Sequence, residues 1–240
     1  MQSVLKKDYL ILASDCGADG KLGVVQTFDI FMDLAAESAE ALDNGIHAMM
    51  ARGLYWTAVK TRARFYRRPE LMERVTVSTW PEAPGRLRND RHYLFTKGDE
   101  VLVTGKTEWT IVDLKNGGLH SPRKLIYPEA LEFSEEQADG DSFHRFTDGA
   151  PWEGFGAYTV RSTDIDLGGH MNNVAYVRML AGMFTVAEWD ALSLREAEVH
   201  YRASCYEGNV LALQKRTAED GAIELRALSG EEQVFLARLT

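Results

Sequence analysis

The sequence is poor in cysteine and has no long apolar segment near its start. These two features argue against a disulfide-stabilised protein, a zinc site and a membrane span. Its two cysteines, Cys16 and Cys205, cannot build a disulfide framework, and they have no histidines at zinc-ligand spacing. The apolar run Tyr9–Ala13 is too short for a signal-peptide core or a membrane span. We therefore expect a cytoplasmic protein with no membrane insertion, no metal site and no organic cofactor.

Basic residues are also in the minority. The 27 Lys and Arg residues face 36 Asp and Glu residues, which gives a formal net charge of −9 and argues against nucleic-acid binding. Positive charge is nevertheless dense in three places, Lys60–Arg64, Arg67–Arg68 and Arg86–Arg91. Two interpretations remain open from sequence alone: these clusters steer an acidic partner, or they are solvated faces of strands.

The pattern of apolar residues indicates one unit written twice in 240 residues. In the first copy, helical spacing over 28–49 is followed by strand-like segments at 63–67, 74–80, 91–96 and 101–112. In the second copy, helical spacing over 174–184 is followed by strand-like segments at 199–202, 209–214, 222–228 and 232–239. A helix followed by antiparallel strands predicts an α+β fold in which each sheet wraps around a long helix.

The copies can be aligned residue by residue. Gly20-Lys21-Leu22 matches Gly169-His170-Met171, Tyr66 matches Tyr201, and Arg74–Thr79 matches Asn209–Gln214. Residues 127–150 are acidic and rich in turn formers, so we expect a linker there, between a first unit over 1–126 and a second over 151–240. Because unpaired strand edges promote aggregation, we expect the two sheets to join edge to edge.

The richest cluster of reactive side chains lies at 161–176, directly before the second apolar helix. Either Asn172 or Asn173 is a suitable N-cap, and the free N–H groups of a helix start can stabilise a developing negative charge. Asp166 and His170 flank this point, with a glycine pair between them that lets the backbone approach a ligand closely. A carboxylate, an imidazole and a helix N-terminus suit hydrolysis or polarisation of a carbonyl compound.

These residues carry a family resemblance. Asp164–Tyr176 (DIDLGGHMNNVAY) resembles the D-x-D-x-N-x-H-x-N-N-x-x-Y block of the acyl-acyl carrier protein thioesterases, double hot-dog enzymes that end fatty-acid synthesis. Tyr201–Cys205 is similar to the later Y-R-x-E-C stretch of that family, and Val75–Pro81 and Thr107–Asp113 are similar to its first half. The resemblance implies two tandem hot-dog units, hydrolysis of fatty acyl thioesters in fatty acid biosynthesis, and acyl carrier protein as the partner.

The resemblance also implies roles for particular residues. Asp166 is the expected general base, and His170 would orient the water, hydrogen-bond the thioester or protonate the leaving thiolate. Cys205 stands at the family's cysteine and is expected in the site, although a buried small hydrophobe is the commoner role of a free cysteine. Asn172 and Asn173 are expected beside the substrate.

Two positions depart from the family pattern. Gly168 replaces an asparagine and Ser204 replaces an acidic residue, so we expect these two positions to border the substrate without supplying the family's polar groups. Glu198 or Glu207 could substitute for them. The first copy has Gly17 and Lys21 where the second has Asp166 and His170, which favours a single active site in the second copy.

Other functions fit the same residues. An acyl-CoA thioesterase would share the chemistry, a hot-dog dehydratase could use Asp166 and His170 as a dyad, and a non-catalytic acyl-binding module would explain Gly168 and Ser204. The apolar stripe of the first helix, with Met32, Met49 and Met50 nearby, could line an acyl channel or could simply be core. Either a monomer or a homodimer is compatible with the sequence.

Overall fold

The computed structural model describes residues 2–240, and the chain divides into two compact units, residues 1–141 and 142–240. The first unit contains a sheet in the order β1-β3-β4-β5-β2, with every neighbouring pair antiparallel and β6 paired with β5. Its strands are β1 (Leu5–Leu10), β2 (Leu54–Phe65), β3 (Arg74–Pro81), β4 (Asn89–Lys97), β5 (Glu100–Asp113) and β6 (Leu119–His120).

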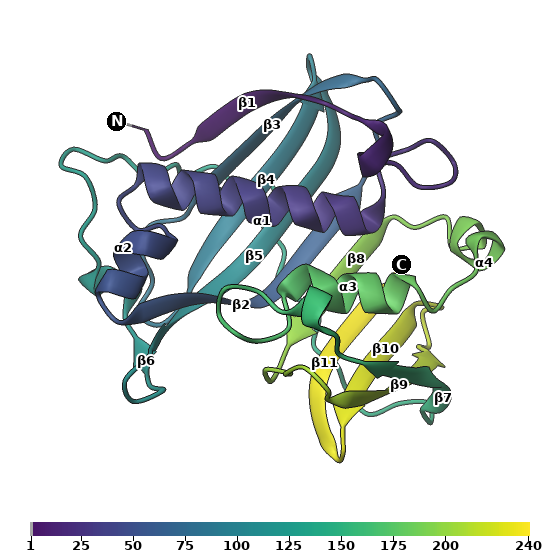
Figure 1. Ribbon diagram of the computed structural model, residues 1–240. Coiled ribbons are helices and arrows are strands. Elements are labelled where there is room, and N and C mark those ends of the chain that lie inside the picture. Colours follow the sequence, from purple (N-terminus) through teal and green to yellow (C-terminus); the bar gives the residue numbers. More distant parts are fainter. Residues whose placement is uncertain (1) are drawn as a thin grey trace. The chain divides into compact units, whose positions relative to one another are not determined.

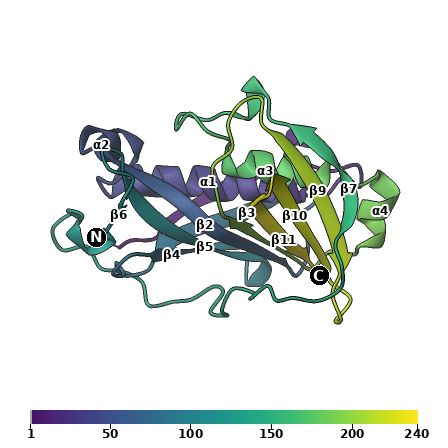
Figure 2. The ribbon, with the colours of Figure 1, turned by 90° about the horizontal axis from the view of Figure 1, so that it is seen from below.

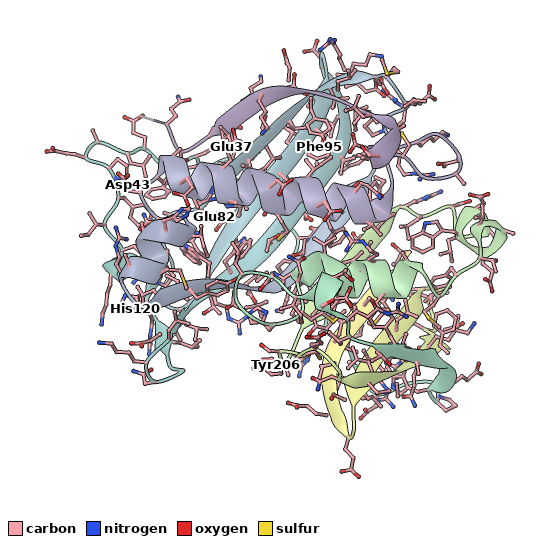
Figure 3. All side chains as sticks on the ribbon, viewed as in Figure 1. Glu37, Asp43, Glu82, Phe95, His120 and Tyr206 are labelled. Carbon is pink, nitrogen blue, oxygen red and sulfur yellow. The ribbon has the colours of Figure 1, made fainter. Side chains whose placement is uncertain are left out.

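Helix α1 (Val24–Ala41) lies along one face of this sheet (Figure 1), and the perpendicular view in Figure 2 shows the same arrangement. Its buried residues recur every three or four positions, as a helix that covers a sheet requires. Phe31 stacks on Tyr93 of β4 with ring centroids 4.1 Å apart and meets Phe95 edge-on. Figure 3 labels Phe95 beside α1. The helix and β4 therefore share one aromatic core.

The helix predicted over 28–49 is interrupted. Helix α1 ends at Ala41, and a second helix, α2 (Ile46–Ala51), begins after Asp43, which has φ 57°. The side chain of Asn44 is buried and donates to the carbonyls of Leu42 and Ile126 at 2.8 and 2.9 Å. Apolar spacing continues across the break because Met49 of α2 is also buried, in a cluster with Leu54, Ile111 and Leu125. Periodicity alone therefore did not reveal the interruption.

The second unit repeats the plan on a smaller scale. Its sheet has the antiparallel order β8-β11-β10-β9-β7, and α3 (Asn173–Ala181) buries Tyr176 against Phe235 with centroids 5.1 Å apart. The strands are β7 (Glu153–Thr159), β8 (Glu196–Tyr201), β9 (Val210–Thr217), β10 (Ile223–Ser229) and β11 (Glu232–Leu239). A short helix, α4 (Val186–Ala191), was not predicted; Thr185 caps it in a capping box with Glu188.

The internal repeat is confirmed by matching hydrogen bonds. Gly17 N–H donates to Lys21 O at 2.9 Å, and Asp166 N–H donates to His170 O at 3.0 Å. However, β2 ends at Phe65 and β8 ends at Tyr201, so Tyr201 corresponds to Phe65 rather than to Tyr66. The same shift applies to the next strand, because β3 begins at Arg74 and β9 begins at Val210, so Arg74 corresponds to Val210 rather than to Asn209. Both strand alignments were wrong by one residue, and one residue on a strand changes the face that a side chain occupies.

The segment expected to be a linker is divided between the units. Residues 127–141 belong to the first unit, where Trp80 Nε1 donates to Glu136 O at 2.8 Å and Arg62 pairs with Asp139. Residues 142–150 belong to the second unit, where His144 N–H donates to Glu198 Oε1 at 2.7 Å. In the described chain, no helix is long and apolar enough to cross a membrane.

Candidate active site

The polar segment before α3 contains a tight turn between Ile165 and Met171, and this turn places Asp166 and His170 together. Residues Ile165 and Met171 pair as an antiparallel bridge, and Gly169 turns the chain with φ 76°, a conformation that favours glycine. Asp166 Oδ1 lies 3.8 Å from His170 Nδ1, and the two side chains are 20% and 23% exposed. Both groups are therefore reachable by water and by a ligand.

The two oxygens of Asp166 have different surroundings. Oδ1 accepts a 2.7 Å hydrogen bond from the N–H of Gly168, which fixes the carboxylate over the turn. Oδ2 makes no hydrogen bond with any residue between 2 and 240. One oxygen thus holds the group in place while the other remains available to accept a proton, as a general base requires.

Helix α3 begins three residues beyond His170. Asn172 is its N-cap, and its Oδ1 accepts from the N–H of Val174 at 2.7 Å. The N–H of Ala175 is bonded to the carbonyl of Asn172, whereas the N–H of Asn173 donates to no atom of the described residues. The prediction of an N-cap here is confirmed, and Asn173 offers one backbone donor at the positive end of the helix.

Cys205 is joined to this turn through its backbone. Its carbonyl accepts from Met171 N–H at 2.7 Å, and its N–H donates to the hydroxyl of Tyr176 at 3.1 Å. The thiol is fully buried, and burial raises its pKa above the usual value. A thiol in this state is a poor nucleophile at neutral pH. Tyr176, which sequence reasoning left without a role, links α3 to this segment.

Of the other predicted positions, Gly168 lies within the turn and Ser204 directly precedes Cys205, whereas Glu198 lies on β8. Gly168 and Ser204 are exposed and contribute no charge. Glu198 is fully buried on β8, where its Oε1 accepts from His144 N–H and contacts His200 Nε2 at 2.7 Å. Because Tyr201 faces α3 and side chains alternate along a strand, Glu198 and His200 face the opposite side. Glu198 therefore does not compensate for the missing acidic group.

The acidic residue before the turn has a structural role. Asp164 is buried, and its Oδ2 accepts from the hydroxyl of Tyr158 and the N–H of Arg161, both at 2.8 Å. Asp15 of the first unit makes the same two kinds of bond, with Tyr9 and Leu12. Asp164 and Asp15 thus hold corresponding turns in shape. No cluster of three or more metal-ligating side chains is present among the residues described.

A cavity of about 210 Å³ lies inside the first unit, under α1 and α2. Its wall includes Met32 and Met49, as the apolar stripe suggested, together with Trp56 and Trp109. Met50, in contrast, is 47% exposed. The mostly apolar lining resembles that of a small-molecule pocket.

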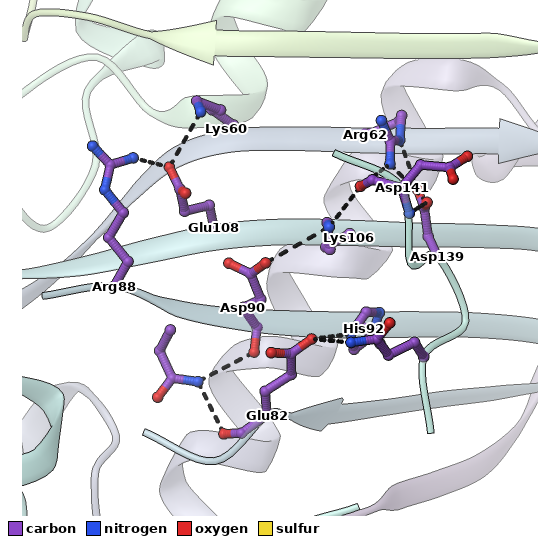
Figure 4. A network of polar contacts seen from close by, with 12 residues as sticks. Lys60, Arg62, Glu82, Arg88, Asp90, His92, Lys106, Glu108, Asp139 and Asp141 are labelled. Carbon is purple, nitrogen blue, oxygen red and sulfur yellow. Dashed lines mark hydrogen bonds and ion pairs between the residues drawn. The ribbon is translucent and has the colours of Figure 1, made fainter. Parts of the chain in front are cut away.

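Most of the basic clusters have acidic partners within the first unit (Figure 4). Arg62 and Arg64 bind Asp139, and Lys60 and Arg88 bind Glu108. Arg67 pairs with Glu73 and Glu100, and Arg68 pairs with Asp19. These residues therefore form intramolecular networks and not an unbalanced positive surface, which weakens the interpretation that they steer an acidic partner.

The sequence matches two domains of one protein family. Residues 2–126 match the acyl-ACP thioesterase N-terminal domain, and residues 153–234 match the acyl-ACP thioesterase C-terminal domain. Among curated proteins, a chloroplastic acyl-[acyl-carrier-protein] hydrolase of Cuphea viscosissima is 22% identical over 86% of this chain and 53% of its own length. A chloroplastic oleoyl-acyl carrier protein thioesterase of Arabidopsis thaliana is 22% identical over 75% of this chain. The chain spans about half the length of these relatives.

Solved structures share the fold. An acyl-ACP thioesterase from Bacteroides thetaiotaomicron superposes with a TM-score of 0.84 at 16% identity and covers 99% of this chain and 97% of its own. A 12:0-ACP thioesterase from Umbellularia californica gives 0.77 at 17% identity, with 99% and 96% coverage. These similarities confirm the predicted α+β fold of two tandem hot-dog units.

Proposed function

The chain belongs to the acyl-acyl carrier protein thioesterase family, and from that premise we propose that it hydrolyses fatty acyl thioesters of acyl carrier protein. The products would be a free fatty acid and the carrier thiol. The observation that carries the proposal is the glycine turn that sets Asp166 and His170 together, immediately before the start of α3. We place the reaction in this turn of the second unit.

In the proposed mechanism, Asp166 acts as general base on a water molecule. Its Oδ2 takes one proton as the water oxygen attacks the thioester carbonyl carbon, and the carbonyl electrons move onto oxygen. The resulting oxyanion accepts a hydrogen bond from the N–H of Asn173 at the helix start. When the oxyanion electrons re-form the C=O bond, the C–S bond breaks and the thiolate leaves with its bonding electrons. It receives the proton held by Asp166, directly or through His170, so that both groups return to their starting state.

A thioester is already activated, so this modest set of groups is chemically sufficient. General acid–base catalysis by one positioned side chain typically contributes about 10²- to 10⁴-fold in rate. Gly168 has no side chain and Ser204 carries only a neutral hydroxyl, so Asp166 and His170 carry most of the chemistry in this proposal. Cys205 is assigned a packing role because its thiol is buried and its pKa is raised.

A non-catalytic acyl-binding module is the second candidate, and Gly168 and Ser204 are the observation that favours it. Such a protein would retain an acyl chain and release no thiol. An acyl-CoA thioesterase or a dehydratase remains an outcome of the test below.

The test is thiol release from acyl carrier protein and CoA thioesters by the full chain and three variants. We expect Asp166→Asn and His170→Gln each to lower kcat/KM on carrier-protein substrates by about 10²-fold or more. Lys21→Ala is the matched control, since Lys21 occupies the position of His170 in the first copy, and it should leave turnover unchanged. Full activity of Asp166→Asn would place the base elsewhere, and no thiol release from any substrate would refute hydrolysis.

A further inference from the structure

An arginine stands in the core-facing row of β4. Side chains alternate along a strand, and Tyr93 and Phe95 of this row contact Phe31 of α1. Arg91 is two residues before Tyr93 and therefore points to the same side, where it is only 7% exposed and lines the cavity under α1. The neighbouring His92 belongs to the outer row and pairs with Glu82, as Figure 4 shows.

Arg91 differs from the other buried arginines in having no acidic partner. Arg62 is held by Asp139 at 2.6 Å, and Arg216 is held by Glu224 at 2.6 Å. Arg91 Nη1 donates only to Thr79 Oγ1, at 3.2 Å, and no carboxylate of residues 2–240 lies within ion-pair distance of it. Burial lowers its pKa, which reflects the cost of a charge without a counter-ion. A buried cation of this kind is destabilising unless something pairs with it.

The residues around Arg91 indicate what kind of ligand could neutralise its charge. The cavity is bordered by apolar groups, including Met32, Ala35 and Trp109, while Arg91 supplies the only charged side chain among the lining residues. A ligand that fills it must be mainly apolar and must carry one anionic group. The planar guanidinium presents several N–H donors and matches a carboxylate in a bidentate manner.

We propose that the cavity of the first unit binds an apolar chain that ends in a carboxylate, with Arg91 as the counter-ion. The assignment of that chain rests on the proposed function. It is either a thioester substrate whose far end carries a carboxylate, or the free fatty acid that hydrolysis releases. The carboxylate is common to both, and the experiment separates them.

The first experiment measures binding without any turnover. Trp56 and Trp109 line the cavity, so their fluorescence should report titration with decanoate and with decanol as the uncharged match. We expect wild-type protein to prefer decanoate, and Arg91→Met to weaken decanoate binding by about 10- to 100-fold while decanol binding stays the same. Arg86→Met, at an exposed arginine before β4, is the control and should change neither affinity.

Folding of the variant is checked independently. Because Arg91→Met removes an unpaired buried charge and keeps most of the side-chain volume, its melting temperature should equal or exceed that of wild type. Arg91→Lys keeps the charge and should retain part of the preference for decanoate. Equal decanoate affinity in wild type and Arg91→Met, or equal wild-type affinity for decanol and decanoate, would overturn the proposal.

The second experiment distinguishes the two sources of the carboxylate. If the substrate supplies it, wild-type protein should have a lower KM for a carboxylate-ended acyl thioester than for the methyl-ended one, and Arg91→Met should remove that difference. If the product supplies it, decanoate should inhibit hydrolysis of the methyl-ended thioester, and Arg91→Met should relieve the inhibition. An inactive protein would refute the proposed function but leave the binding result intact.

Discussion

Breaking the buried ion pair between Arg62 and Asp139 should strongly destabilise the first unit. Arg62 Nε and Nη2 reach the two oxygens of Asp139 at 2.6 and 2.7 Å, and the side chains are 2% and 0% exposed. The pair fastens residues 134–141 to the outer face of the sheet, helped by a 2.8 Å bond from Arg62 to the carbonyl of Asp141. Replacing Asp139 by asparagine keeps the shape, removes the charge and turns one of the two acceptor oxygens into an NH2 donor.

The expected loss follows from leaving Arg62 charged and buried. Removing one partner of such a pair costs about 3–5 kcal/mol. For a chain of this size, each kcal/mol lowers the melting temperature by about 2–4 °C, so Asp139→Asn should melt about 6–20 °C lower. Urea denaturation should show a lower midpoint with little change in the slope m.

Two further variants make this prediction refutable. Asp141→Asn is the control, because that carboxylate is 70% exposed and its pair with Arg64 should contribute at most about 1 kcal/mol. The double variant Arg62→Met with Asp139→Leu replaces both charges by apolar groups and should recover most of the lost stability. A cost below about 1 kcal/mol for Asp139→Asn, or no recovery in the double variant, would contradict the reasoning.

Three smaller predictions follow from other contacts. Asn172→Ala removes the N-cap of α3 and should lower the free energy of unfolding by about 1 kcal/mol in urea denaturation. Gly105→Ala would drive a methyl group into the ring of Phe31, and such overpacking should cost about 1–3 kcal/mol, measured as a lower melting temperature. Hydrogen bonds from Arg67 hold the pKa of Glu73 well below its ordinary value of 4.5, so the stability that Glu73 contributes is present above that value and is lost as the pH falls. Glu73→Gln should therefore be less stable at neutral pH and lose less stability on acidification, as urea midpoints would show.

The duplicated architecture could be predicted because the two copies share a turn as well as a hydrophobic pattern. The glycine turns at Gly17–Lys21 and Asp166–His170 make the same backbone bonds, and each precedes a helix with a clear apolar stripe. The residue-by-residue alignment of equivalent strands in the two copies was harder to predict from the sequence. Phe65 and Tyr201 are both aromatic and lie at the ends of equivalent strands, but Tyr66 beside Phe65 offered an equally plausible match.

Whether a charged residue is exposed, ion-paired or buried was the feature least predictable from the sequence. Lys60–Arg64 and Arg86–Arg91 are similar clusters in sequence, yet they contain exposed, ion-paired and buried arginines. Their partners lie far away along the chain, with Asp139 77 positions from Arg62. Only the alternation of Arg91 with Tyr93 and Phe95 could have indicated that one arginine enters the core.

Comparison of the two turns separates scaffold from chemistry. Asp15 and Asp164 occupy equivalent positions and make equivalent bonds to a tyrosine hydroxyl and to a backbone N–H, so a carboxylate there serves the turn itself. The chain can build the same turn without Asp166 or His170, since Gly17 and Lys21 support identical backbone bonds in the first copy. The shape of the turn therefore does not require His170, and it uses only one oxygen of Asp166, which accepts from the N–H of Gly168. Because an equivalent turn forms with Gly17 and Lys21 at these positions, the reactive side chains of Asp166 and His170 are the strongest physical reason to test these two residues for catalysis.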